Sequence, residues 1–182
     1  GDAISAILHA GLVVKEEAGL LLAGTSGRGK TTLTLELTEA GWAFGGDDMI
    51  ALRSDGTATA LPLGAHLKKI EDVLARANAR VVEWCDAEGG LFWPSHAVPP
   101  GRRINIRSIL LPHFDPGHAP ELNAVSPEAA LEALVTTGSE PVGTTRSLSG
   151  IANLVNTARA FTLTYASTAQ ALDLIDALPS TT

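Results

Sequence analysis

One short stretch of the chain combines residue types that could hold a phosphate. Residues 24–31 read GTSGRGKT, which matches the pattern G-x-x-x-x-G-K-[ST]. In such a loop, glycines let backbone N–H groups turn toward phosphate oxygens, the lysine reaches the terminal phosphates, and the last hydroxyl ligates Mg²⁺. The stretch therefore predicts binding of a nucleoside triphosphate, ATP or another, together with Mg²⁺. The candidate nucleotide-binding residues are Gly24, Thr25, Ser26, Gly27, Arg28, Gly29, Lys30, Thr31 and Thr32.

Two adjacent acids follow this stretch. Asp47 and Asp48 come directly after Gly45 and Gly46, and we expect them to begin a strand over residues 49–52. Phosphoryl transfer needs a carboxylate for the metal and often a second one that orients or deprotonates the acceptor. Adjacent residues of an extended segment point to opposite sides, so both acids can face one metal only if the backbone is irregular. The alternative is a pair of solvated acids in a turn.

The hydrophobic pattern predicts the elements that would position these residues. The apolar run from residue 19 ends at Gly24, as a buried strand would, and Leu33 and Leu37 have helical spacing. The loop at residues 24–29 thus lies between a strand and a helix. Strands are expected over residues 2–10, 12–14, 20–23, 49–52, 57–61, 81–85, 90–93, 104–111 and 160–166, helices over 30–40, 69–79, 144–159, from 126 and from 167, and a loop over 112–125. The pattern indicates one α/β domain over residues 1–182, with a mixed sheet flanked by helices.

The composition restricts the class of protein. The 182 residues are 45% hydrophobic and 18% charged, with a net charge of −7, which is typical of a globular chain. An acidic domain binds nucleic acid or an anionic membrane poorly, because phosphate affinity needs a basic face. The single cysteine, Cys85, excludes an internal disulfide and fits a reducing, cytoplasmic setting. We expect neither a signal peptide nor a membrane span, since a span needs about 20 apolar residues.

The order of these features resembles the catalytic core of bacterial HPr kinase/phosphorylase and its shorter relatives, within the phosphoenolpyruvate carboxykinase-like superfamily. The shared pattern is a histidine before the strand, the glycine-rich loop, a helix ending in glycine, and an Asp-Asp pair. Here these are His9, residues 24–31, Gly41, and Asp47 with Asp48, so the resemblance covers residues 9–52. It implies a fold of the HPr kinase C-terminal-domain type and ATP- and Mg²⁺-dependent transfer of phosphate to a serine hydroxyl.

The resemblance also implies roles for individual residues. One aspartate acts as base toward the acceptor hydroxyl and the other helps to hold Mg²⁺; we assign Asp47 as the base, and Asp48 with Thr31 as metal ligands. His9 and Lys30 are placed near the transferred phosphate. Short relatives resemble kinases that phosphorylate a serine of a lasso peptide, which implies a peptide or small-protein acceptor. A homo-oligomer is compatible with the resemblance.

Other interpretations stay open. A nucleotide-binding regulatory or scaffold module would bind ATP without transfer, and a small-molecule or carboxykinase-like kinase would use another acceptor. Arg102 and Arg103 could stabilise charge on a transferring phosphate, or could be exposed basic residues. His113, Asp115 and His118 lie within one short segment, where a metal site is conceivable although the spacing is unspecific.

Overall fold

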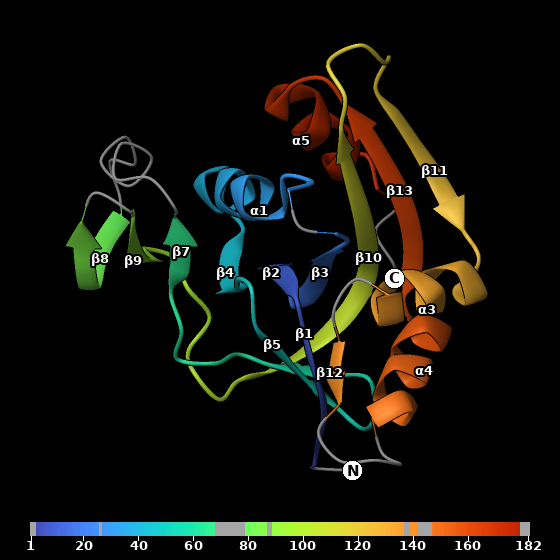
Figure 1. Cartoon of the computed structure of the whole chain (residues 1–182), viewed down its shortest axis with the longest axis horizontal. Helices are drawn as coiled ribbons and strands as arrows, with labels where there is room; N and C mark the ends of the chain where they lie inside the picture. The colour runs from blue at the N-terminus through green and yellow to red at the C-terminus, as the bar shows by residue number, and fades with distance from the viewer. Residues whose placement is uncertain are drawn as a thin grey trace.

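The computed structural model describes residues 3–25, 27–67, 79–86, 89–136, 139–141 and 147–178. In this part of the chain a ten-stranded mixed sheet is accompanied by a separate three-stranded sheet and by helices (Figure 1). The large sheet contains β1 (Ile4–Leu8), β2 (Ala10–Lys15), β3 (Ala18–Ala23), β4 (Ala43–Gly46), β5 (Ile50–Arg53), β6 (Ala58–Thr59), β10 (Arg103–Phe114), β11 (Glu121–Val125), β12 (Ser139–Pro141) and β13 (Arg159–Tyr165). The small sheet contains β7 (Ala65–Leu67), β8 (Ala79–Asp86) and β9 (Gly89–Pro94). The helices are α1 (Lys30–Glu39), α3 (Pro127–Thr136), α4 (Ser147–Thr157) and α5 (Thr168–Asp176).

The strand directions bring five segments of the chain to one edge of the large sheet. β10 pairs in parallel with both β3 and β13. β2 is antiparallel to β3 and to β4, so β4 runs in the same direction as β3. The C-terminal ends of β3, β4, β10 and β13 and the start of β2 therefore lie at the same edge. We call this edge, which is marked by His9, Gly24, Asp47, Phe114 and Tyr165, the site edge.

Two hydrophobic layers cover opposite faces of the sheet. Along β3, Leu20 and Leu22 pack in one core cluster with residues of α1 and α5, whereas Leu21 packs in another with residues of α3 and α4. The same alternation separates Leu110 from Ile109 in β10, because successive strand residues point to opposite faces. Figure 1 shows α1 and α5 in the upper part of the view and α3 and α4 at the lower right. Burial on both faces explains why β3 is a continuous apolar run.

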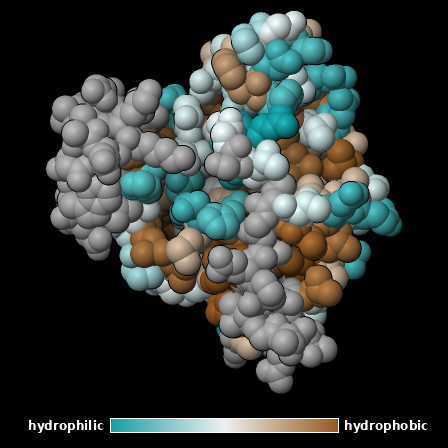
Figure 2. Space-filling model, in the orientation of Figure 1, coloured by the Kyte–Doolittle hydropathy of each residue, from teal (hydrophilic) through white to brown (hydrophobic). Residues whose placement is uncertain are grey.

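The surface that Figure 2 presents is mixed in polarity. Apolar atoms gather on the right side of this view, where Figure 1 places α3 and α4. Val135 of α3 and Leu148 of α4 are 44% and 61% exposed. Of the helices that the structure describes, none has the length and apolar character that crossing a membrane requires.

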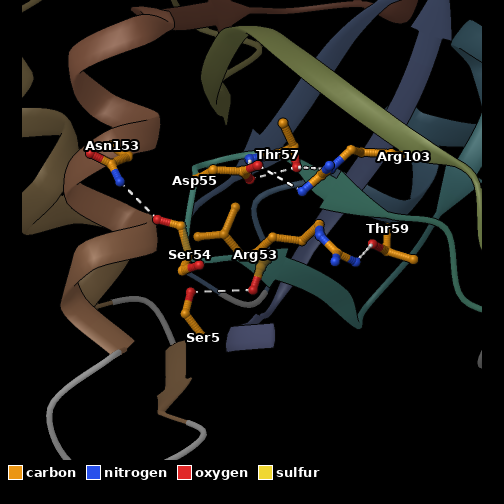
Figure 3. Close-up of polar contacts among 9 residues, drawn as sticks. Ser5, Arg53, Ser54, Asp55, Thr57, Thr59, Arg103 and Asn153 are labelled. Carbon is orange, nitrogen blue, oxygen red and sulfur yellow. Dashed lines mark hydrogen bonds and ion pairs between the residues drawn. The ribbon is translucent and has the colours of Figure 1, made fainter. Parts of the chain in front are cut away.

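The predicted Asp-Gly turn joins β5 to β6, and a polar network holds it in place (Figure 3). Asp55 accepts hydrogen bonds from the Thr57 backbone N–H at 3.0 Å and from Nη2 of Arg103 at 2.7 Å. Nδ2 of Asn153, in α4, donates to the Ser54 carbonyl oxygen at 2.7 Å. The network thus ties the hairpin to β10 on one side and to α4 on the other.

Changing Gly56 in this turn to alanine is expected to destabilise the protein by about 2 kcal/mol or more. Gly56 has a φ of 86°, and a Cβ there would lie 2.8 Å from the backbone nitrogen of Leu154 in α4. Urea unfolding of wild type and variant would measure the loss. Gly101→Ala is the matched control, because Gly101 has a similar φ of 83° but no atom of the described residues, apart from its chain neighbours, lies within 4 Å of its Cβ position. Equal losses in the two variants would contradict the collision with α4.

Several predicted elements are confirmed, and others need correction. The helix from residue 30, the start of a helix after Ser126 and the Ser167 cap of α5 are present, with Ser167 accepting from the Gln170 N–H at 3.4 Å. The helix expected over residues 69–79 falls mostly outside the described residues. The loop expected over residues 112–125 is wrong, because β10 continues to Phe114 and residues 121–125 form β11 beside β13.

The expected position of the aspartate pair is also wrong. Residues 43–46 form β4, a strand that the sequence does not predict, and β5 begins only at Ile50. Asp47 and Asp48 therefore follow one strand and precede the next, instead of beginning a strand. Pairing with β2 stabilises β4 despite its two glycines, which have weak intrinsic strand propensity.

Candidate functional site

Three glycines of the loop between β3 and α1 have positive φ values. Gly24, Gly27 and Gly29 have φ values of 135°, 81° and 88°, a region that residues with side chains rarely adopt. Gly29 precedes α1 and has no side chain with which to bond the first N–H groups of the helix. These groups and the positive end of the helix dipole can therefore serve an anion at this point. Ser26 lies outside the described residues.

The amine of Lys30 folds back over the loop. Nζ donates to the carbonyl oxygen of Gly24 at 2.6 Å and to that of Thr25 at 3.1 Å. Partial burial lowers the pKa of Lys30, and the negative charges of Asp47 and Asp48 oppose this shift. The amine is thus within electrostatic reach of both acids.

Asp47 places a buried carboxylate beside the start of α1. Asp47 is 5% exposed, and its Oδ2 atom has no hydrogen-bond partner among the described residues. Burial raises the pKa of Asp47 to about 6, hydrogen bonding from the Thr31 side chain lowers it, and the nearby charge of Asp48 raises it. A buried carboxylate oxygen without a partner costs free energy, and such an atom commonly marks a functional group or an ion site. Thr31 itself is half-buried, whereas the next residue, Thr32, is exposed.

Asp48 faces solvent and pairs with a histidine from the bend between β1 and β2. Its φ of 66° is in the left-handed region, so the chain turns sharply directly after Asp47. Nδ1 of His9 lies 3.0 Å from Oδ1 of Asp48, and the two side chains are 45% and 66% exposed. His9 occupies the bend between β1 and β2, which brings it to the site edge. The two aspartates therefore face different surroundings because the chain turns between them, and not because they alternate along an extended strand.

Two residues that the motif does not contain also reach the loop. Arg28 contacts Nδ1 of His113, near the end of β10. Tyr165, the last residue of β13, is 4% exposed, and its hydroxyl oxygen would lie 2.6 Å from a Cβ placed on Gly29. The glycine thus leaves room for the tyrosine hydroxyl. The sequence indicates only that Tyr165 lies near the end of a predicted strand. It does not indicate which strand lies beside that one in the sheet.

The remaining candidates lie elsewhere or pair among themselves. Arg102 and Arg103 lie at the start of β10, at the opposite end from the site edge, where they pair with Glu17 and Asp55. The hypothesis that they act on a transferring phosphate is therefore not supported. In the ranges that the structure describes, no group of three or more His, Cys, Asp or Glu side chains could hold a metal ion. His118 instead bonds through Nδ1 to Oδ2 of Asp115 at 2.6 Å.

Comparisons with known proteins add a distant structural likeness. No family model matches the chain, and no curated protein matches its sequence. The chain is similar to the solved structure of the Hpr(Ser) kinase/phosphatase from Coxiella burnetii, with 13% identity and a TM-score of 0.45, over 94% of this chain and 92% of that one. A likeness this distant assigns neither a family nor an activity, so the functional proposal rests on the site.

Proposed function

We propose that the protein is a phosphotransferase that uses ATP and Mg²⁺ to phosphorylate a hydroxyl, in particular a serine of a peptide or small protein. The observation that supports it most is that Lys30 and Thr31 interact with Asp47, whose buried Oδ2 atom has no hydrogen-bond partner among the described residues. If Asp47 served only to shape a turn, a fully hydrogen-bonded or apolar side chain would be more stable there, because a buried carboxylate oxygen without a partner is costly. The free-energy cost of burying this carboxylate is explained if its Oδ2 atom binds a cation.

The residues present fit a magnesium ion bound together with a triphosphate. Mg²⁺ takes oxygen ligands and is commonly held by one or two carboxylates plus substrate phosphates. The Thr31 hydroxyl and Oδ2 of Asp47 are oxygens of this kind, and the two side chains interact at the start of α1. An ion held there supplies positive charge to the phosphate oxygens. Lys30 and the loop N–H groups hold the phosphates themselves.

The contacts favour a different assignment of the two aspartates from the one made on the resemblance. Asp47 interacts with Thr31, so we assign Asp47 with Thr31 to the metal. Asp48 is exposed and bonded to His9, so we assign this pair to the acceptor. The acceptor hydroxyl gives its proton to the pair, its oxygen takes the γ-phosphoryl group, and ADP leaves. The class of acceptor and the HPr kinase type of fold are supported by the resemblance over residues 9–52.

Asp48→Asn is designed to separate transfer from nucleotide binding. Asparagine keeps the size of the side chain and tolerates a positive φ, but it does not accept a proton. Transfer of labelled γ-phosphate from ATP to a library of serine peptides should fall by about 100-fold or more, whereas the affinity for MgATP should change little. Asp176→Asn is the matched control, because Asp176 is an exposed acid paired with Lys15 at 3.1 Å, away from the site edge.

The outcomes of this experiment distinguish the alternatives. Tight MgATP binding by the wild type without transfer to any peptide would favour a regulatory nucleotide-binding module. Transfer to free serine would favour a small-molecule kinase. Wild-type protein that does not bind MgATP would overturn the proposal as a whole.

A further inference from the structure

A half-exposed aromatic ring lies at the site edge. Phe114 ends β10 and is 50% exposed. It is the aromatic member of a small set of exposed large apolar residues in the described part of the chain, the others being Met49, Leu63, Val135 and Leu148. Single exposed apolar side chains are common and need no special explanation. The meaning of Phe114 therefore depends on its neighbours.

Phe114 is connected to the glycine-rich loop through one other ring. It pairs with Tyr165 in the parallel register of β10 and β13, and the two rings meet edge to face with centroids 5.6 Å apart. The hydroxyl of Tyr165 in turn occupies the space beside Gly29, directly before Lys30. Tyr165 is buried whereas half of the Phe114 surface is open, so Phe114 extends an aromatic layer from the loop out to solvent.

The order of the strands separates the acids from the aromatic residues at the site edge. On one side of β3 come β2 and then β4, which ends at Asp47 and Asp48; on the other side come β10 and β13. In the proposed reaction the terminal phosphate lies with Lys30 and the acids. A nucleoside on the side of the loop away from the acids would lie at the ends of β10 and β13, which carry Phe114 and Tyr165 and lie side by side in Figure 1.

We propose that Phe114 is a stacking surface for the base of the nucleotide whose phosphates bind residues 24–31. This inference rests on the proposed function and extends it to the nucleoside. An aromatic side chain stacks on any base, because every base has a π face. We therefore expect Phe114 to increase affinity for nucleotides in general, with little discrimination between ATP and GTP.

The test compares ligands with and without a base. Calorimetric titrations of MgATP and of magnesium tripolyphosphate, which has phosphates but no nucleoside, are made with wild type, Phe114→Ala and Phe114→Trp. Phe114→Ala should weaken MgATP binding about tenfold and leave tripolyphosphate binding unchanged. Phe114→Trp should restore MgATP binding. Leu148→Ala, a truncation of another exposed apolar side chain, is the control and should alter neither affinity.

Each other outcome has a definite meaning. An unchanged MgATP affinity in Phe114→Ala overturns the inference. Equal losses for both ligands also overturn it, because Phe114 would then act on the loop through Tyr165 and not on the base. If the wild type binds tripolyphosphate as tightly as MgATP, the base site is refuted while the phosphate site stands. If the wild type binds neither ligand, the proposed function itself fails.

Discussion

Replacing Lys30 with methionine is expected to lower the affinity for MgATP by about 100-fold and to reduce phosphoryl transfer at least as much. A hydrogen bond from a charged group contributes about 1.5–3 kcal/mol, and each 1.4 kcal/mol corresponds to about a factor of ten in affinity. In the structure, Nζ of Lys30 donates hydrogen bonds to the carbonyl oxygens of Gly24 and Thr25. A phosphate would give the ammonium an anionic partner instead, which is the stronger type of hydrogen bond. Calorimetry measures the affinity, and labelled ATP measures the transfer.

Lys15→Met is the matched control for this change. It also removes a lysine amine, but Lys15 ends β2 away from the site edge and pairs there with Asp176. An exposed ion pair of this kind contributes little to stability, so both the fold and the nucleotide affinity should persist. If Lys30→Met binds MgATP as tightly as wild type, the phosphates do not bind at residues 24–31.

The glycine-rich loop and its helix could be predicted from the sequence because the information there is local. Residues 24–31 are contiguous, the preceding apolar run is long enough to read as a strand, and Leu33 and Leu37 mark the helix. The positive φ values of Gly24, Gly27 and Gly29 agree with the need for glycine at those positions. Local sequence thus specifies the backbone conformation of the loop.

The surroundings of the two aspartates could not be predicted in the same way. The strand β4 contains two glycines and no alternation of apolar residues, and its pairing with β2 decides its conformation. The sequence pattern does not predict β4, and it therefore places Asp47 and Asp48 at the beginning of a strand. Which carboxylate is buried depends on the turn after β4, where Asp48 adopts a positive φ.

Which residues the distant strands bring to the glycine-rich loop depends on the order of the strands in the sheet, and this order cannot be predicted from one sequence. His113 meets Arg28, and Tyr165 meets Gly29, only because β10 lies next to β3 and β13 lies next to β10. The residues are far apart in the chain, and no motif links them. The same order places Phe114 on the side of the loop opposite the aspartates.

Changing Asp47 to asparagine should make the ligand-free protein more stable at neutral pH, by about 1–3 kcal/mol, while it abolishes magnesium-dependent transfer. The pKa of Asp47 in the folded protein is about 6, against an ordinary value of 3.8. Between these values the folded state binds more protons than the unfolded state, so the free energy of unfolding falls as pH rises through this window. Above about pH 7 the full cost of the buried charge is present. Asparagine carries no charge and removes this cost.

Unfolding in urea between pH 4 and pH 8 measures the effect. The two proteins should have similar stability near pH 4, and the variant should become the more stable one as the pH rises. Asp48→Asn is the control. Asp48 is exposed, and removing its charge only lowers the pKa of Asp47 somewhat, so the stability of Asp48→Asn should rise less than that of Asp47→Asn. A variant at Asp47 that is less stable than wild type at pH 8 would contradict the assignment of a destabilising buried carboxylate.

Excess MgATP should reverse this order of stability. A ligand that binds only the folded state stabilises it by an amount that grows with the ratio of ligand concentration to its dissociation constant. Wild-type protein, in which we propose that Asp47 and Thr31 hold Mg²⁺, should therefore gain stability with MgATP, whereas Asp47→Asn should gain much less. Such a reversal would show that the carboxylate destabilises the empty protein because it is arranged to bind a cation. Equal stabilisation of both proteins by MgATP would instead separate Asp47 from the metal.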